Sequence, residues 1–185
     1  MHVVLERSAS STAVVEKRYS TTVLDWVLTG QIDMFDGTVL YDYKLTSAWT
    51  YVFGIREEWI AQSNVNRWLM HKNEVDVKSL KNILFFRDWS ESKVGGKYPD
   101  VMVKEVDLPM WSLEDTETYV KRRISMHQAS MNLSDEMLSS IYPCSDEDRW
   151  FNRKSQQFLR CEKYCPVRNL CRQRQNAELL QSANG

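Results

Sequence analysis

Two β-rich runs separated by an Asp-Gly dipeptide constrain this chain more than any other stretch. The first run, WVLTGQIDMF, covers residues 26–35, and the second, TVLYDYKL, covers residues 38–45. Asp36-Gly37 between them is a two-residue hairpin signal, because such turns need positive φ angles that this dipeptide accepts. The sequence therefore predicts an antiparallel β-hairpin that places Asp33 roughly opposite Leu40.

Three charged side chains interrupt this otherwise apolar hairpin. Side chains alternate between the two faces of a strand, so Asp42 and Lys44 share one face and Tyr43 points to the other. Asp33, on the preceding strand, lies one diagonal step from Asp42 in the predicted register. A carboxylate pair resists burial unless a cation accompanies it, and Mg²⁺ or Mn²⁺ prefers oxygen ligands. The pattern indicates a metal site, with Lys44 placed to assist an attacking water.

The simpler interpretation of the same residues is a surface hairpin with a cross-strand Asp–Lys pair. Such an exposed pair contributes under about 1 kcal/mol and carries no functional information. Both interpretations stay open on the hairpin alone.

Further elements of both kinds follow the hairpin. A short strand is expected before it, and two buried strands and two amphipathic helices after it, at residues 14–19, 79–89, 98–111, 55–72 and 112–131. Mixed strands and helices over this length predict an α/β domain with a central mixed sheet flanked by helices. We expect this core to span residues 1–132 and a polar, cysteine-rich segment to occupy residues 133–185.

The order of motifs resembles that of the PD-(D/E)XK nuclease superfamily. The chain carries G-x-x-D at Gly30 and Asp33, then D-x-K at Asp42 and Lys44, then a helix that bears Gln62. Its RecB-like branch is the most similar, including the CRISPR-associated RecB-like exonucleases and their phage relatives. The resemblance implies a restriction-endonuclease-like core that hydrolyses DNA.

The resemblance also implies roles for individual residues. His2 would add a nitrogen ligand to the Mg²⁺ or Mn²⁺ held by the carboxylates, and Tyr43 would add its backbone carbonyl. Gln62 would position the nucleotide or support the site, and Lys44 would complete the catalytic set. Asn66 stands where the family's Q-x-x-x-Y motif has tyrosine. The helix that leads into the family's histidine is missing, so we expect an N-terminally truncated nuclease core.

All four cysteines lie in the last quarter of the chain, at Cys144, Cys161, Cys165 and Cys171. Their C-x3-C-x5-C spacing, with one cysteine further upstream, suits a [4Fe–4S] cluster or tetrahedral zinc, and spacing does not separate the two. The resemblance favours iron–sulfur. The alternative is four unligated thiols, which is difficult to reconcile with so polar a segment.

Positive charge also gathers in this segment, although the net charge of the chain is only −1. Eight basic residues and one acidic residue lie between positions 149 and 174. Either this is a solvated basic surface or it contacts phosphates. The residues predicted to bind nucleic acid are Arg149, Arg153, Lys154, Arg160, Lys163 and Arg168.

These features together predict a cytoplasmic, metal-dependent DNA exonuclease that prefers single strands, with recombination, repair or CRISPR-type proteins as partners. The sequence contains no P-loop, G-x-G-x-x-G or G-x-S-x-G motif and no apolar run of membrane-spanning length. Trp49, just beyond Lys44, is a candidate for stacking on a nucleobase. The competing hypothesis is a non-catalytic nucleic-acid-binding or assembly module that keeps the nuclease fold and a zinc-held tail.

Overall fold

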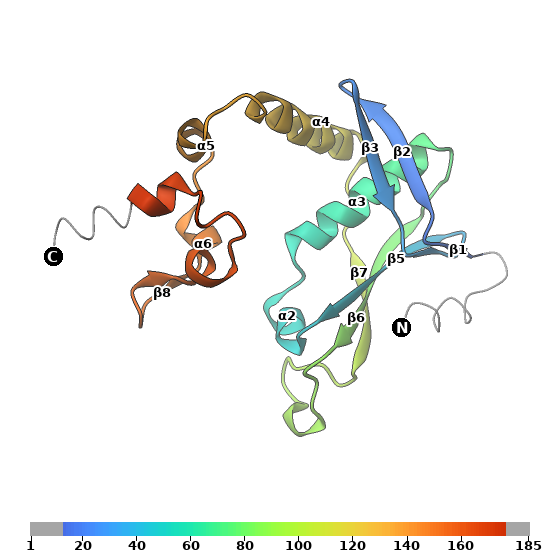
Figure 1. Cartoon of the computed structure of the whole chain (residues 1–185). Coiled ribbons are helices and arrows are strands. Elements are labelled where there is room, and N and C mark those ends of the chain that lie inside the picture. The colour runs from blue at the N-terminus through green and yellow to red at the C-terminus, as the bar shows by residue number, and fades with distance from the viewer. Residues whose placement is uncertain (1–12, 177–185) are drawn as a thin grey trace. The chain divides into compact units, whose positions relative to one another are not determined.

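The computed structural model of the chain describes residues 13–176 (Figure 1). The chain divides into two compact units, residues 1–124 and residues 125–185. Within the described part of the chain, no helix is both long and apolar enough to span a membrane.

A five-stranded mixed sheet forms the centre of the first unit. Its strand order is β1-β4-β5-β6-β7, and β5 and β6 are parallel while the other neighbouring pairs are antiparallel. The strands are β1 Val14–Val15, β4 Met34–Phe35, β5 Val39–Thr46, β6 Ser79–Phe86 and β7 Val103–Leu108. Together with the helices described below, this sheet confirms the predicted mixed α/β class.

The predicted strand over residues 26–35 is divided in two by the structure. Its first part, β3 (Trp26–Gln31), pairs with β2 (Arg18–Val23) in a separate two-stranded sheet. Its second part is β4, which joins the central sheet. Ile32, which is almost fully buried, lies at the break, and its N–H donates to the carbonyl of Lys17. One apolar run therefore serves two sheets.

The predicted two-residue turn at Asp36-Gly37 is wrong. Phe35 pairs with Leu40, and the Asp36 N–H donates to the Val39 carbonyl at 3.3 Å, so the turn lies one residue further along, at Gly37-Thr38. The cause is the Asp36 carboxylate, whose Oδ1 accepts hydrogen bonds from the N–H groups of Thr38 and Val39 at 2.9 and 2.8 Å. These side-chain bonds favour a turn shifted by one residue from the turn that the Asp-Gly signal predicts.

In the described part of the first unit, the sheet and the hairpin are accompanied by α2 (Ala48–Phe53), α3 (Glu57–Lys72) and the larger part of α4 (Leu113–Ser130), whose last six residues belong to the second unit. The two long helices were predicted, and α4 begins as expected. Ser112 Oγ accepts from the Asp115 N–H at 2.9 Å and donates to the Asp115 carboxylate at 2.6 Å. α2 was not predicted.

The buried face of the central sheet carries two separate hydrophobic clusters. One contains Leu40 and Leu80 and packs against α3, and the other contains Leu84 and Phe86. Between them, the strands β5 and β6 bury polar residues, at Asp42 and Asn82. Because burying polar groups is costly, this polar layer is the part of the core that most needs a functional explanation.

The second unit is built from short elements. They are α5 (Asp135–Ile141), α6 (Asp146–Arg149), β8 (Phe151–Asn152), β9 (Gln157–Phe158) and a π-helical turn (Arg160–Tyr164). No residue between 125 and 176 is buried. This unit therefore lacks a hydrophobic core of its own over the residues that the structure describes.

Candidate metal centre

The register of the hairpin brings the two predicted metal-binding carboxylates together. Met34 pairs with Tyr41, and continuing this antiparallel register places Asp33 opposite Asp42. The predicted diagonal offset between them is therefore wrong, and its correction brings the two residues closer. Asp33 Oδ2 accepts a hydrogen bond from the Tyr43 N–H at 2.7 Å. The carboxylate of Asp33, the residue just before β4 begins, thus lies against the backbone of β5.

Lys44 links this strand to helix α3. Its Nζ lies 2.6 Å from Asp42 Oδ2 and donates to Gln62 Oε1 at 2.8 Å. The same Nζ lies 5.8 Å from the centroid of the Trp59 ring, also on α3. All four predicted catalytic residues therefore meet at one place, on the sheet face that α3 covers. The polar side chains do not diverge to opposite faces.

The electrostatics of the centre are set by the burial of Asp42. Its side chain is 9% exposed and that of Lys44 is 16% exposed. Burial raises the pKa of Asp42, the ammonium of Lys44 opposes that rise, and the neighbouring carboxylate of Asp33 adds to it. Two carboxylates and one lysine leave the centre with a formal charge of −1 when all are ionised. A divalent cation would stabilise the ionised form of Asp42.

The donor set fits a hard divalent ion. Asp42 Oδ2 is buried, and within residues 13–176 no hydrogen-bond donor is aligned with it. No group of three or more His, Cys, Asp or Glu side chains capable of holding a metal occurs among these residues. Mg²⁺ is nonetheless held in many enzymes by one or two carboxylates, with waters and substrate phosphate as the other ligands. Asp33 and Asp42 satisfy that minimum, while His2 lies outside the described residues.

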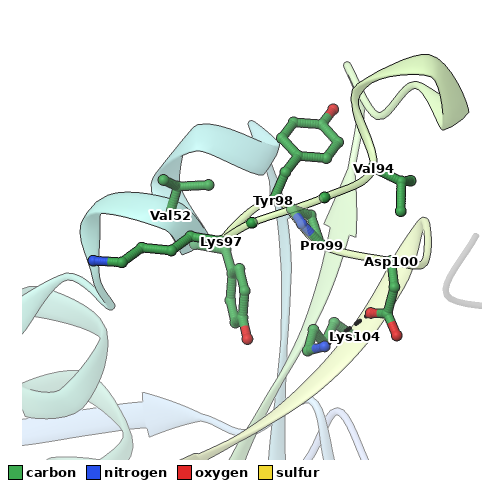
Figure 2. Close-up of a pocket in the computed structure, with 10 residues that line it drawn as sticks. Val52, Val94, Lys97, Tyr98, Pro99, Asp100 and Lys104 are labelled. Carbon is green, nitrogen blue, oxygen red and sulfur yellow. Dashed lines mark hydrogen bonds and ion pairs between the residues drawn. The ribbon is translucent and has the colours of Figure 1, made fainter.

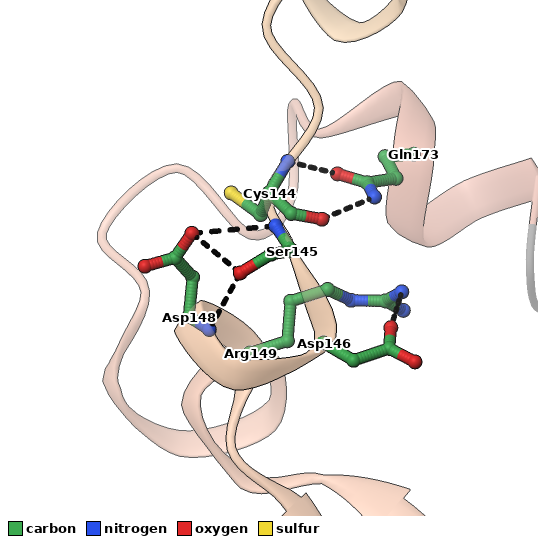
Figure 3. A network of polar contacts seen from close by, with 6 residues as sticks. All are labelled: Cys144, Ser145, Asp146, Asp148, Arg149 and Gln173. Carbon is green, nitrogen blue, oxygen red and sulfur yellow. Dashed lines mark hydrogen bonds and ion pairs between the residues drawn. The ribbon is translucent and has the colours of Figure 1, made fainter.

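The four cysteines are all described, and they do not converge into a metal-holding group. Each is a free thiol. Burial raises the pKa of the Cys144 thiol, and the neighbouring Cys171 adds to the rise. The backbone of Cys144 is held by Gln173, which accepts from its N–H and donates to its carbonyl, both at 2.9 Å (Figure 3). Ligation of iron–sulfur or zinc by these cysteines stays a prediction.

Some of the predicted DNA-binding residues already have partners inside the second unit. The Arg149 guanidinium lies 3.4 Å from the centroid of the Phe158 ring. Arg160 and Arg168 donate to the carbonyls of Asp148 and Glu162, at 3.0 and 2.6 Å. The remaining three, Arg153, Lys154 and Lys163, are exposed. Contact with nucleic acid stays a prediction for all six.

Helix α2, which directly follows β5, was missed by the sequence analysis. Asp88 anchors it, since its carboxylate accepts from Ser47 Oγ at 2.6 Å and from the Ala48 N–H at 2.8 Å. These bonds lower the pKa of Asp88. Trp49 and Phe53 stack on α2 with ring centroids 6.1 Å apart, and they are 45% and 83% exposed. Ser47, a favoured N-cap residue, was the available signal.

Two further residues of α2, Tyr51 and Val52, border a surface hollow of about 620 Å³ (Figure 2). Its lining also includes Lys97, from the segment between β6 and β7, and Lys104 on β7. Lys104 Nζ donates to Asp100 at 3.0 Å and lies 5.3 Å from the centroid of the Tyr51 ring. The hollow does not include the carboxylates of the candidate metal centre.

Comparison with protein-family models, curated proteins and solved structures finds no significant match to this chain.

Proposed function

We propose that this protein is a metal-dependent nuclease with a PD-(D/E)XK, restriction-endonuclease-like core that hydrolyses DNA phosphodiester bonds. The observation that carries the proposal is the meeting of Asp33, Asp42, Lys44 and Gln62 on one face of the sheet. A sheet core normally buries apolar groups at such a position, as it does at Leu40 and Leu80. A buried carboxylate beside a second carboxylate and a lysine is the arrangement that divalent-metal phosphodiester chemistry needs.

Each residue has a role that its geometry supports. Asp33 and Asp42 would hold Mg²⁺ or Mn²⁺, with the Tyr43 carbonyl and His2 as further predicted ligands. When bound, the ion would polarise the scissile phosphate and lower the pKa of a water molecule. The Lys44 ammonium would stabilise negative charge that grows on the phosphate oxygens. Gln62, through its bond to Lys44, restricts the position of that ammonium.

The preference for single-stranded DNA and exonuclease action is the finer part of the proposal. It is supported by the exposed Trp49–Phe53 pair on α2, the helix that directly follows β5. Exposed aromatic rings bind single strands because every nucleobase offers a face on which to stack.

The second unit would contribute a [4Fe–4S] cluster, or zinc, and a basic surface. The supporting observation is the absence of any buried residue between positions 125 and 176. A segment with so little core normally requires a metal or another staple to stay folded. DNA and repair-type or CRISPR-type proteins are the partners proposed for this unit.

Digestion of an end-labelled single-stranded oligonucleotide in Mn²⁺ tests the proposal. The wild-type chain should degrade the substrate, and Lys44→Ala should reduce the rate by at least about a hundredfold, in line with the loss of one charge-stabilising group. Lys81→Ala is the matched control, because Lys81 pairs with Glu105 on the opposite face of β6. Equal rates for all three proteins would contradict the nuclease. Binding of the oligonucleotide without metal-stimulated cleavage would instead support the non-catalytic module.

A further inference from the structure

The polar layer beneath α3 contains a residue that the proposed nuclease mechanism does not use. Asn82, on β6, is completely buried, and neither its Nδ2 nor its Oδ1 has a hydrogen-bond partner. Leaving a buried amide unpaired costs about 1–3 kcal/mol per group, so natural cores rarely keep one without a reason.

Asn82 lies beside Asp42, one of the two carboxylates of the candidate metal centre. It pairs with Asp42 in the parallel register of β5 and β6, and both residues lie on the buried face. Neighbouring strands lie about 4.8 Å apart, so side chains at paired positions on the same face are adjacent. The only charged partner of Asp42 Oδ2 among the described residues is Lys44, whose ammonium lies 2.6 Å away without the alignment of a hydrogen bond. An unpaired amide donor and a carboxylate oxygen that is held by an ion pair alone therefore occupy adjacent positions.

Ser63, on α3, is a third polar residue that is relevant to Asn82 and Asp42. Its Oγ is buried and unpaired as well. Gln62, one residue earlier, contacts β5 through Lys44, and Asn64, one residue later, accepts from Trp111 beyond β7 at 2.8 Å. Since β6 lies between β5 and β7, the helix turns the Ser63 side chain toward β6, the strand that carries Asn82.

We propose that Asn82 is a positioning residue for Asp42, and that Ser63 positions Asn82 in turn. In the metal-bound state these atoms would form one donor–acceptor series, in which Ser63 Oγ–H donates to Asn82 Oδ1 and Asn82 Nδ2–H donates to Asp42 Oδ2. The series would form when the bound metal displaces Lys44 from Asp42, because the ammonium then no longer occupies Oδ2. The inference rests on the proposed function, since it assigns the series to the metal-bound state.

Two measurements on the 185-residue chain separate this role from a structural one. Asn82→Leu removes the unpaired amide, so the melting temperature of the metal-free protein should rise. The same substitution should weaken Mn²⁺ binding by about tenfold or more, as the loss of a residue that hydrogen-bonds to a metal ligand does. Electron paramagnetic resonance of the free ion measures this affinity. Ser63→Ala should shift both measurements in the same directions.

Thr116→Val is the matched control. Thr116 is also completely buried, but its Oγ1 donates to the Ser112 carbonyl at 2.8 Å. This variant should therefore melt at a lower temperature and bind Mn²⁺ as the wild type does. A lower melting temperature for Asn82→Leu, or unchanged Mn²⁺ affinity, overturns the inference while leaving the nuclease proposal intact. Failure of the wild-type protein to bind Mn²⁺ overturns both.

Discussion

Replacing Gly30 with alanine tests how closely strand β3 lies against helix α3. The φ of Gly30 is outside the left-handed region, so its backbone accepts an alanine, and a less flexible unfolded chain would stabilise the variant by about 0.4–1 kcal/mol. A Cβ at this position, however, would lie 2.8 Å from Leu69 Cδ1 and closer still to Asn66 Oδ1. Overpacking of this kind costs about 1–3 kcal/mol. We therefore expect a net loss of about 1–2 kcal/mol in the free energy of unfolding.

Urea unfolding followed by tryptophan fluorescence measures this loss, since six of the seven tryptophans lie in residues 1–124. Asn66→Ala removes the closer obstacle, so the cost of Gly30→Ala should be smaller in that background. The coupling between the two substitutions should be at least about 0.5 kcal/mol. If Gly30→Ala is as stable as the wild type, or if the two effects are additive, the close approach of β3 to α3 is wrong.

Three further predictions follow from the site. Asp42→Asn should stabilise the protein at neutral pH and abolish cleavage. The folded pKa of Asp42 lies above its ordinary value of 3.8, so the protonated carboxyl contributes favourably to the free energy of unfolding below pH 3.8. This contribution is lost as the pH rises through the raised pKa. Urea unfolding should therefore show that the difference in free energy of unfolding between Asp42→Asn and the wild type widens as the pH rises through the raised pKa. A difference independent of pH would contradict the raised pKa of Asp42. Trp49→Ala should weaken binding of a fluorescent oligodeoxythymidine by about 1–3 kcal/mol in an anisotropy titration. Trp26→Ala, which changes another partly exposed tryptophan, should leave this binding unchanged. Equal losses of affinity in the two variants would exclude stacking at α2. Anaerobically purified protein should show the visible absorption of thiolate-bound iron and lose it on Cys161→Ser, and a colourless, zinc-loaded sample would contradict the iron–sulfur prediction.

The sequence predicted which side chains would lie close together better than it predicted the hairpin that holds them. The spacing of Asp42 and Lys44 places them on one face of a strand whatever the register, because alternation depends only on local strand geometry. The position of Asp33 depended on the turn, and the Asp36 carboxylate altered the turn through bonds to two backbone N–H groups. Local side-chain bonds of this kind override a dipeptide preference.

Other features depended on a turn without the usual dipeptide signal or on contacts between distant segments. The break after β3 follows from the hairpin of β2 and β3, whose two-residue turn places Leu24 and Asp25 at positive φ, where Asn-Gly or Asp-Gly is the usual signal. The anchoring of α2 likewise requires Asp88, which is 41 residues beyond Ser47. The buried amide of Asn82 was hidden in an apolar run, SLKNILFF, that reads as an ordinary core strand. Its significance became visible only once the register placed it beside Asp42.

Anomalous diffraction from a crystal soaked in Mn²⁺ would test the central claim most directly. The account predicts one strong anomalous peak bonded to the carboxylates of Asp33 and Asp42, with Lys44 Nζ moved away from its 2.6 Å contact with Asp42. A map without a peak between these carboxylates, and with the Lys44–Asp42 ion pair intact, would show that the polar layer is structural and that the nuclease proposal is wrong.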